Sequence, residues 1–526
     1  MTSSIKTQNE QDHLVTEMER LKIEGGAATM VEQCRKLLGE IDTFEAYLTS
    51  HGHSVELRHF RGSVNTECKL LEKVCSLYNL KTVILTRGQL AKADPDAPKT
   101  AHTLRSSNFP FYAAVWDAAK QCDGVIALEM RFHWAVGQSR KRIPGSGSGS
   151  RSGTSSPAPG SQDGKTPKPH KGQTSVLVDI VALNGLEWIK VSTLTEKRML
   201  FDIAKAGWVA GDSEFSSDDG NDSDDEPEGL LRLAEGLARA SKASRIRYQY
   251  PSIRIVLPKI GKGCVREVEA VFSQIEALGI QIVRKEEIEA SSEVEKVLSR
   301  MMVDEFAHFT DTINVDCTIL LALVSDLSHM PVEVEDWHHK AVKQQIVRER
   351  DDQLLPKSLW PACGNRKLVC TKEAKQRMME IVQLIGTDAE KQRTELIIGG
   401  GRSYSAEERI RGLQALSSHR IPVELKLPIE TVEVDVAEME KEIGYLAVAV
   451  KEELTAINQS VFFYGWAKGL TTISSNRTVA KEIENCVEAN RKSDDERGPD
   501  IWLCNTARSL VGKEKTRRDG KGLRVV

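Results

Sequence analysis

One acidic residue, Asp316, stands where an apolar strand gives way to an apolar helix, and this position suits metal or phosphate chemistry. The stretch from Ile313 to Ser328 reads INVDCTILLALVSDLS, with Thr318 two residues after the aspartate. In open α/β sheets, ligands and metal ions are held at the carboxyl ends of strands, where the next helix presents unpaired N–H groups. We therefore expect Asp316 to be a catalytic residue and metal ligand. Its alternative role is that of a helix N-cap.

The elements that must position Asp316 alternate between strand and helix from Thr312 onward. Apolar runs and helical periodicity predict five strands and five long helices. The strands are expected at 312–316, 367–371, 423–427, 471–474 and 501–504, and the helices at 318–327, 337–351, 373–385, 438–456 and 478–489. This order predicts a three-layer α/β/α domain with a mainly parallel sheet.

The N-terminal half predicts a helical block followed by a smaller α+β region. Residues 11–135 carry helical periodicity, with one short strand at 82–85. A β-hairpin is expected around Asn184-Gly185, with strands at 175–182 and 186–191. A strand at 253–258, a helix at 265–278 and a strand at 280–283 then form a βαβ unit, which implies parallel pairing.

Two segments lack the large apolar side chains needed to offset the entropy of ordering. The first, 137–174, is rich in Gly, Ser and Pro, and the second, 211–229, is an acidic tract. Both are expected to be solvated loops. The predicted organisation is a helical domain (1–136), a linker (137–174), an α+β domain (175–295) with the insertion 211–229, a second α/β domain (296–511) and a basic tail (512–526).

The bulk composition excludes several classes of protein. The 72 basic and 76 acidic side chains nearly cancel to a net charge of −4, so no global field marks the chain as a nucleic-acid or membrane binder. The ten cysteines form no CxxC pair and no zinc-type spacing, which indicates reduced thiols. No signal peptide and no apolar run of about eighteen residues is present. We expect a cytoplasmic or nuclear protein without a membrane partner.

Several short motifs, taken in order, resemble one protein family. They are Leu104-Arg-Ser-Ser-Asn108, Val178-Asp-Ile-Val-Ala182, Trp188-Ile-Lys190, Asn314-Val-Asp-Cys-Thr-Ile-Leu320, Thr472-Ile-Ser-Ser-Asn476 and Ala507-Arg-Ser-Leu510. Together they resemble an uncharacterised eukaryotic family whose C-terminal half is the domain-of-unknown-function 1308 region, classed as PIN-like. The resemblance spans most of the chain. It implies a nuclease-derived domain over 296–511, in which three or four carboxylates gather around one or two Mg²⁺ or Mn²⁺ ions.

The resemblance also implies which residues would join Asp316. Gln376 aligns with the second acidic position of the family pattern. Glu373 and Glu380 lie one helical turn to either side on the same face, and they are the candidate metal ligands. Thr318 matches the hydroxyl neighbour of the first aspartate and is expected to contact substrate or phosphate.

The remaining positions of the family pattern hold neutral residues. Asn458 and Asn476 stand at the third and fourth positions, where they are expected to contact phosphate or to serve as capping and turn residues. The family's Gly-rich, FGTGD-like turn is Tyr464-Gly-Trp-Ala-Lys-Gly469 here, without an acidic member. A unit charge about 4 Å from a divalent ion is worth roughly 8 kcal/mol at an effective dielectric near 20. We therefore expect a degraded Mg²⁺ or Mn²⁺ site.

The hairpin contains a second set of residues that could bind a metal. Asp179, Glu187 and Lys190 resemble the restriction-endonuclease arrangement of an Asp followed by Glu-x-Lys, in which the carboxylates bind Mg²⁺ and the Lys orients water. Here the Glu and the Lys are three residues apart, so on a strand of period two they point to opposite faces. We expect instead that Glu187 is exposed at the turn and that Trp188 packs inward.

Two functions are compatible with these features. The leading hypothesis is a nuclease-derived, RNA-associated protein with a degraded metal site, which would be a divalent-metal-dependent ribonuclease if active. Basic clusters, the strongest of them in the tail 512–526, would add affinity for the RNA backbone. The alternative is a catalytically inactive scaffold that binds protein partners and is regulated through its acidic and basic linkers.

Overall fold

A computed structural model describes residues 28–86, 104, 106–135, 173–209, 229–399 and 404–512. The chain divides into two compact units, of which the first comprises Met1–Ile246 and Tyr250–Asp304 and the second comprises Arg247–Gln249 and Glu305–Val526. Nearly all of the two predicted linkers and of the basic tail lies outside the described residues. The boundary at 304/305 falls nine residues after the predicted start of the C-terminal domain at 296.

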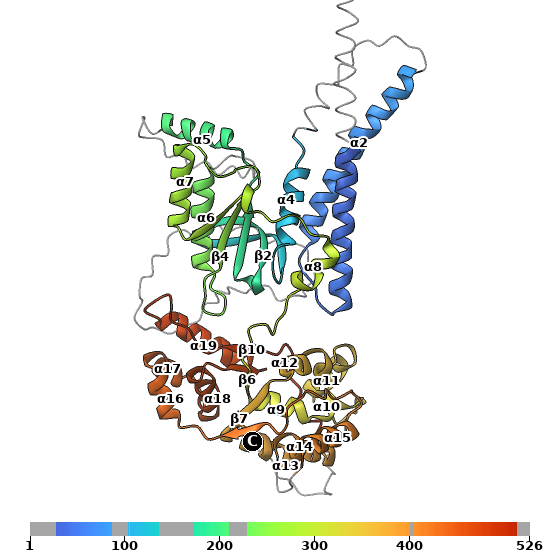
Figure 1. The fold of residues 1–526 in the computed structure, drawn as a ribbon. Coiled ribbons are helices and arrows are strands. Elements are labelled where there is room, and N and C mark those ends of the chain that lie inside the picture. Colours follow the sequence, from blue (N-terminus) through green and yellow to red (C-terminus); the bar gives the residue numbers. More distant parts are fainter. Residues whose placement is uncertain are drawn as a thin grey trace, which may run out of the picture. The chain divides into compact units, whose positions relative to one another are not determined.

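The first unit is built on a mixed sheet of five strands in the order β1-β2-β3-β4-β5 (Figure 1). The strands are β1 (Ala127–Ala135), β2 (Gln173–Ala182), β3 (Glu187–Val191), β4 (Ser252–Leu257) and β5 (Ile280–Arg284). β2 is antiparallel to both of its neighbours, whereas β3, β4 and β5 are parallel. The β2–β3 turn passes through Asn184 with a φ of 56° and Gly185 with a φ of 93°. Asn and Gly adopt a left-handed backbone at low cost, so this turn suits a hairpin. The predicted hairpin and the predicted βαβ unit are both confirmed.

Helices cover both faces of this sheet (Figure 1). One core cluster joins Ile180 and Ile189 to the helix of residues 28–50, α2 (Arg58–Thr86), α4 (Phe109–Ala119) and α8 (Val294–Met301). The opposite cluster joins Trp188 and Ile255 to α5 (Glu196–Val209), α6 (Leu230–Ala243) and α7 (Arg266–Ala277). Because the helical segments and the α+β region share these cores, they form one unit rather than two separate domains.

Two predictions in the first unit were wrong. Residues 82–85, predicted as a strand, continue helix α2, because a four-residue apolar run cannot be told from a helix segment by periodicity alone. Residues 127–135, predicted as part of a helical block, form β1. The partner of β1 is β2, which follows it by some forty residues in the chain, so local periodicity could not reveal the pairing.

The second unit contains a sheet of five strands, all parallel, in the order β10-β9-β6-β7-β8. The strands are β6 (Thr312–Val315), β7 (Lys367–Thr371), β8 (Glu430–Val432), β9 (Thr471–Ser474) and β10 (Ile501–Leu503). The predicted α/β class and parallel sheet are therefore confirmed. The strand expected at 423–427 is absent, and the short β8 pairs with β7 instead.

Helices flank this sheet and complete a three-layer arrangement. One core cluster packs the strands against α9 (Cys317–Val324), α12 (Trp360–Cys363), α13 (Lys372–Ile385), α14 (Asp388–Ile398) and α15 (Ala406–Ala415). Another core cluster joins α16 (Val436–Ile443), α17 (Tyr445–Lys451), α18 (Ala456–Ala467) and α19 (Arg477–Asn490). The second unit also contains α10 (Asp326–His329), α11 (Lys340–Asp351) and a short π-helix, η3 (Leu355–Leu359).

One predicted helix of the second unit is interrupted, and a separate observation concerns all described helices. The single helix expected at 438–456 is broken into α16 and α17 at Gly444, which has a φ of 89°. Within the described part of the chain, no helix combines the length and apolar character needed to cross a membrane.

Candidate functional site

The carboxyl ends of three neighbouring parallel strands lie side by side in the second unit. β6 runs into α9 after Asp316, β7 runs into α13 after Thr371, and β9 runs into α19 after Asn476. Because β9, β6 and β7 are adjacent and parallel, the N-termini of three helices meet at one edge of the sheet. We call this place the carboxyl edge, and it comprises Asp316, Thr318, Thr371, Ser474, Ser475 and Asn476.

Asp316 is buried at the carboxyl edge and its carboxylate is engaged by hydroxyl groups. The residue is 2% exposed. Its Oδ2 accepts hydrogen bonds from Oγ1 of Thr318 at 2.7 Å and from Oγ of Ser474 at 2.6 Å. Burial raises the pKa of Asp316, and the two hydroxyl donors oppose that rise. The strand-end position predicted for Asp316 is thus observed, together with a partner, Ser474, that sequence reasoning missed.

The other polar groups of the carboxyl edge bond mainly to one another. Oγ1 of Thr318 also accepts the N–H of Ser475 at 3.1 Å, which ties the start of α9 to the end of β9. Oδ1 of Asn476 accepts the N–H of Val479 at 3.3 Å, so Asn476 is the N-cap of α19. The capping role considered for Asn476 is therefore the one observed.

Glu373 and Glu380 lie on α13 but do not build a cluster of metal ligands with Asp316. Glu373 is in the first turn, and its buried Oε2 has no hydrogen-bond partner among the described residues. Glu380 is exposed and accepts a hydrogen bond from Nε2 of Gln376 at 3.1 Å. No group of three or more His, Cys, Asp or Glu side chains able to hold a metal occurs in the described ranges. The donor set at Asp316 therefore does not fit a Mg²⁺ or Mn²⁺ ion.

Asn458 lies in the first turn of α18, where its N–H donates to Oγ1 of the N-cap residue Thr455. Two residues later, Ser460 makes the contact to the carboxyl edge, because its Oγ lies 3.1 Å from Oγ1 of Thr371. Thr371 in turn caps α13 by accepting the N–H of Ala374. Hydroxyl residues at strand ends were the sequence signal that could have identified Thr371 and Ser474, whereas Ser460 lies within α18 and carried no such signal.

The segment from Tyr464 to Gly469, which aligns with the family's Gly-rich turn, is mostly the end of helix α18. A methyl group added to Gly465 would overlap Oγ1 of Thr472 and lie 3.1 Å from Nδ2 of Asn314. Asn314 is fully buried in β6 and donates to the carbonyl oxygen of Val461 at 2.8 Å. The glycine therefore serves the close packing of α18 on the sheet.

Basic side chains predominate in the first turns of the two longer helices at the carboxyl edge. Residues 372–377 carry three basic side chains and one acidic side chain, and residues 477–482 carry two basic side chains and one acidic side chain. Lys372 is paired with Glu433 at 2.8 Å and Arg377 with Glu380 at 3.4 Å, while Arg477 is exposed. The charge of Arg377 also opposes the burial that raises the pKa of the Cys317 thiol to about 12. Two of the basic side chains at the start of α13 therefore already have acidic partners.

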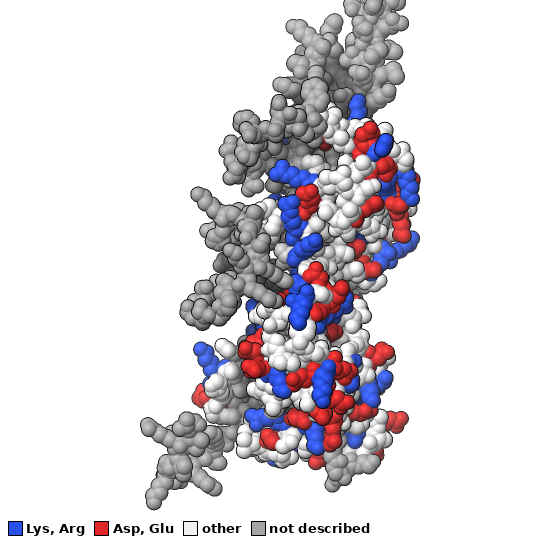
Figure 2. Space-filling view, turned by 90° about the vertical axis from the view of Figure 1, so that its left-hand side faces the viewer, with Lys and Arg blue, Asp and Glu red and all other residues white. Residues whose placement is uncertain are grey.

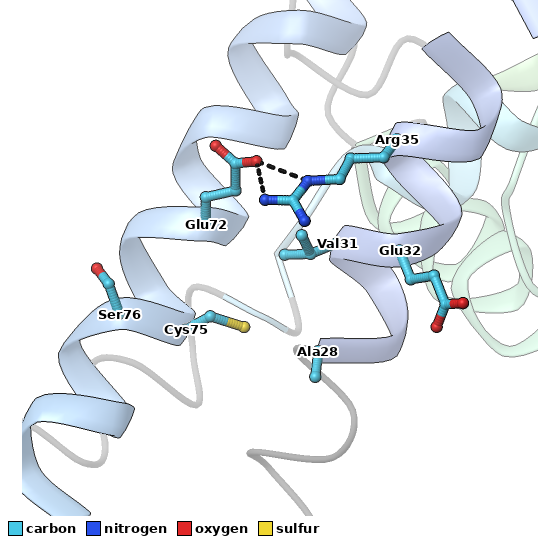
Figure 3. A pocket seen from close by; sticks show the side chains of 7 residues that line it. All are labelled: Ala28, Val31, Glu32, Arg35, Glu72, Cys75 and Ser76. Atoms are coloured by element: carbon cyan, nitrogen blue, oxygen red, sulfur yellow. Dashed lines mark hydrogen bonds and ion pairs between the residues drawn. The ribbon is translucent and has the colours of Figure 1, made fainter. Parts of the chain in front are cut away.

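A pocket in the first unit has no evident relation to the carboxyl edge. It has a volume of about 420 Å³ and lies between the helix of residues 28–50 and α2 (Figure 3). Arg35 crosses from the first helix to Glu72 on α2, with 2.7 Å between Nη2 and Oε1. Val31 and Cys75 supply apolar lining. The two charges that cross this pocket, those of Arg35 and Glu72, therefore already neutralise each other.

The comparison with known families agrees with the sequence resemblance. Residues 313–419 match the family model described as "Protein of unknown function (DUF1308)". The matched region begins in β6, contains Asp316, and ends after α15, so Asn458 and Asn476 lie beyond it. No curated protein and no solved structure matches the chain. The expected domain-of-unknown-function 1308 region is therefore confirmed for these residues.

Proposed function

We propose that the second unit is a PIN-like, nuclease-derived domain that binds single-stranded RNA at the carboxyl edge without a metal ion. The observation that carries this proposal is the meeting of three helix N-termini around one buried carboxylate. The N-terminus of a helix carries the positive end of its dipole, which favours phosphate oxygens, although Thr371 and Asn476 already accept one N–H each at α13 and α19. The exposed Arg477 adds a positive charge at the start of α19.

Metal-dependent cleavage at Asp316 is disfavoured by the chemistry of the donors. A divalent ion at Oδ2 would have to displace the hydroxyls of Thr318 and Ser474, which lie 2.7 and 2.6 Å away. No group of three or more metal-binding side chains compensates for that loss within the described residues. Binding of backbone phosphates by arginine and backbone N–H groups needs no such cluster.

The charge distribution limits the size of the proposed RNA surface. On the face drawn in Figure 2, basic and acidic side chains are intermixed over the described residues. This pattern agrees with the near balance of 72 basic and 76 acidic residues. RNA affinity is therefore expected to depend on a few local contacts and to fall steeply with salt.

The first test asks whether Asp316 takes part in cleavage. Purified full-length protein and its Asp316→Asn variant are incubated with Mn²⁺ and single-stranded RNA, and degradation is followed on denaturing gels. We expect equal rates for the two proteins, because Asp316 is a structural acceptor for two hydroxyls. A large loss of Mn²⁺-dependent degradation in Asp316→Asn alone would restore a metal role for this residue.

The second test measures RNA binding in EDTA by fluorescence anisotropy at several salt concentrations. We expect the full-length protein to bind, and the double variant Arg477→Gln/Lys481→Gln to lower the salt slope by about 1.4, or about 0.7 for each lost phosphate contact on a single strand. The matched control Lys340→Gln/Arg348→Gln removes two charges from α11 and should leave the slope unchanged. No binding in EDTA, or equal slopes for both double variants, would refute the proposal and favour the protein-interaction scaffold.

A further inference from the structure

Three arginine side chains are buried among the described residues of the second unit, and one of them lacks an anionic partner. Arg393 pairs with Asp326 at 2.6 Å, and Arg508 pairs with Glu349 at 2.5 Å. Arg409 on α15 is only 5% exposed, yet no ion pair joins it to a carboxylate in the described part of the chain. Because an unpaired buried charge is costly, the guanidinium of Arg409 requires a compensating group.

The hydrogen bonds of Arg409 use one end of its guanidinium group. Nη1 donates to the carbonyl oxygens of Glu395 at 3.1 Å and of Leu396 at 2.8 Å, in the last turn of α14. The ring centroid of Tyr404 lies 5.7 Å from the guanidinium carbon. Nε is buried without a hydrogen-bond partner, and no hydrogen bond joins Nη2 to any residue that the structure describes. We call Nε and Nη2 together the Arg409 fork.

Capping of α14 accounts for Nη1 but not for the Arg409 fork. A cation at the C-terminus of a helix is stabilised by the last carbonyl groups, and this is the structural role of Arg409. The N–H groups of Nε and Nη2 point in the same direction, in the geometry that matches two oxygens of a carboxylate or phosphate. In Arg393 the same two atoms both donate to the carbonyl oxygen of Leu416, at 3.0 and 2.6 Å. The equivalent donors of Arg409 are left open.

A small space lies beside the Arg409 fork. Gly399 ends α14 with a φ of 83° and lies next to the guanidinium. A Cβ atom added to Gly399 would lie 3.8 Å from Nη2 and 3.9 Å from Cβ of Pro428, with no closer neighbour. The missing side chain therefore leaves room beside Nη2, where an oxygen atom can approach to the hydrogen-bond distance of about 2.9 Å.

Two acidic side chains near this space have other partners. Oε2 of Glu408, the residue before Arg409, accepts the N–H of Ser405 at 2.7 Å in the capping box of α15. Glu430, two residues after Pro428, pairs with Lys367 at 2.7 Å. Neither carboxylate therefore serves as the counterion of Arg409.

The charged groups of the hairpin in the first unit, by comparison, are fully engaged. Both oxygens of Asp179 accept hydrogen bonds at 2.7 Å, one from Nζ of Lys190 and the other from a backbone N–H. Glu187 pairs with Arg254 at 3.1 Å and is half-buried rather than exposed, so that expectation was wrong, while Trp188 is fully buried as predicted. These carboxylates leave no open donor or acceptor like that of Arg409.

We propose that the Arg409 fork binds an oxyanion, the phosphate or carboxylate group of a small molecule. Nε–H and Nη2–H donate to two oxygens of this group, which neutralises the buried guanidinium. Since Arg409 is only 5% exposed, the site admits a single small group rather than a polymer backbone. Pro428 precedes β8, so the site lies at the amino end of this parallel strand. The carboxyl edge lies at the opposite end of the sheet, and the proposed RNA binding does not involve this site.

The test measures anion binding to the full-length protein by isothermal titration calorimetry, with inorganic phosphate and acetate titrated separately. We expect one site per chain for at least one anion, and the anion that binds identifies the chemical group of the ligand. Arg409→Lys keeps the charge but loses the paired donors, so it should weaken binding about tenfold or more. The matched control Arg411→Lys changes an exposed arginine of the same helix and should bind as the wild type does.

A second variant and a second control make the result specific to this site. Gly399→Ala fills the space beside Nη2 and should also weaken binding, and it decides the question if circular dichroism shows that Arg409→Lys is unfolded. Arg477→Gln/Lys481→Gln should leave anion binding unchanged, because these residues belong to α19 at the carboxyl edge. The proposal would be overturned by wild-type protein that binds neither anion at about 10 mM, or by folded variants of Arg409 and Gly399 that bind as tightly as wild type.

Discussion

Replacing His329 with glutamine should remove much of the acid sensitivity of the second unit. The imidazole is fully buried, with Nε2 2.8 Å from the carbonyl oxygen of Leu323 and Nδ1 2.9 Å from Oγ of Ser417. The carbonyl can only accept, so Nε2 carries the proton and Nδ1 accepts from the serine hydroxyl. Burial lowers the pKa of His329 to about 3, and the charge of Arg393 contributes to this decrease.

The size of the effect follows from proton linkage. In the unfolded chain a histidine titrates near the model value of 6.5, whereas the folded chain binds this proton only near 3. Between these values the unfolded state binds more protons, so the free energy of unfolding falls as the pH decreases below 6.5. At about pH 5 the loss amounts to about 2 kcal/mol, at about 1.4 kcal/mol per pH unit.

The assay must report on the second unit alone, because the chain has two units and unfolding need not be two-state. Urea unfolding at about pH 7.5 and about pH 5 is followed by hydrogen-exchange labelling of peptides that cover residues 313–329. The wild type should lose about 2 kcal/mol more than His329→Gln between the two pH values. The exposed His339 provides the control His339→Gln, which should behave as the wild type. Equal losses in the wild type and His329→Gln would refute the reasoning.

Three other perturbations test the packing of the second unit. Gly465→Ala should lower the free energy of unfolding by about 1–2 kcal/mol, because the added methyl group overlaps Thr472 even though alanine has the better helix propensity. Thermal unfolding should show that the double variant Gly465→Ala/Thr472→Ala recovers part of this loss. Arg508→Met leaves the buried carboxylate of Glu349 without its ion pair and should cost about 3–5 kcal/mol in urea unfolding, with most of it recovered in Arg508→Met/Glu349→Leu. Burial raises the pKa of Cys363 to about 12, so mass spectrometry should find this thiol alkylated by iodoacetamide only after unfolding, and rapid labelling of native protein would contradict its placement.

Long-range pairing limited how much of the fold was predictable. β6, β7 and β9 were found because each is a short segment with β-branched or apolar residues that is followed within three residues by a helix start, so the signal is local. β1 and β8 were missed because each depends on a distant partner: β1 follows a helical block, and β8 is only three residues long. The break between α16 and α17 occurs at Gly444, whose backbone is left-handed. The sequence alone did not reveal this break, because a glycine can also lie within a helix.

The same limit applies to the candidate sites. The strand-to-helix junction at Asp316 is a local pattern, so its position at the carboxyl edge could be predicted. Its contact with Ser474 joins residues 158 positions apart and required the order of the sheet. In the hairpin, period-two alternation correctly separated Glu187 from Lys190, but alternation along one strand says nothing about the register across strands that brings Lys190 to Asp179.

The most direct measurement is the number and affinity of Mn²⁺ ions bound by the full-length protein, read from the electron paramagnetic resonance of unbound Mn²⁺. Wild type and Asp316→Asn are titrated side by side. Both proteins should give the same binding curve, because Oδ2 of Asp316 is already engaged by the hydroxyl groups of Thr318 and Ser474. Loss of a bound Mn²⁺ ion in Asp316→Asn alone would contradict the account.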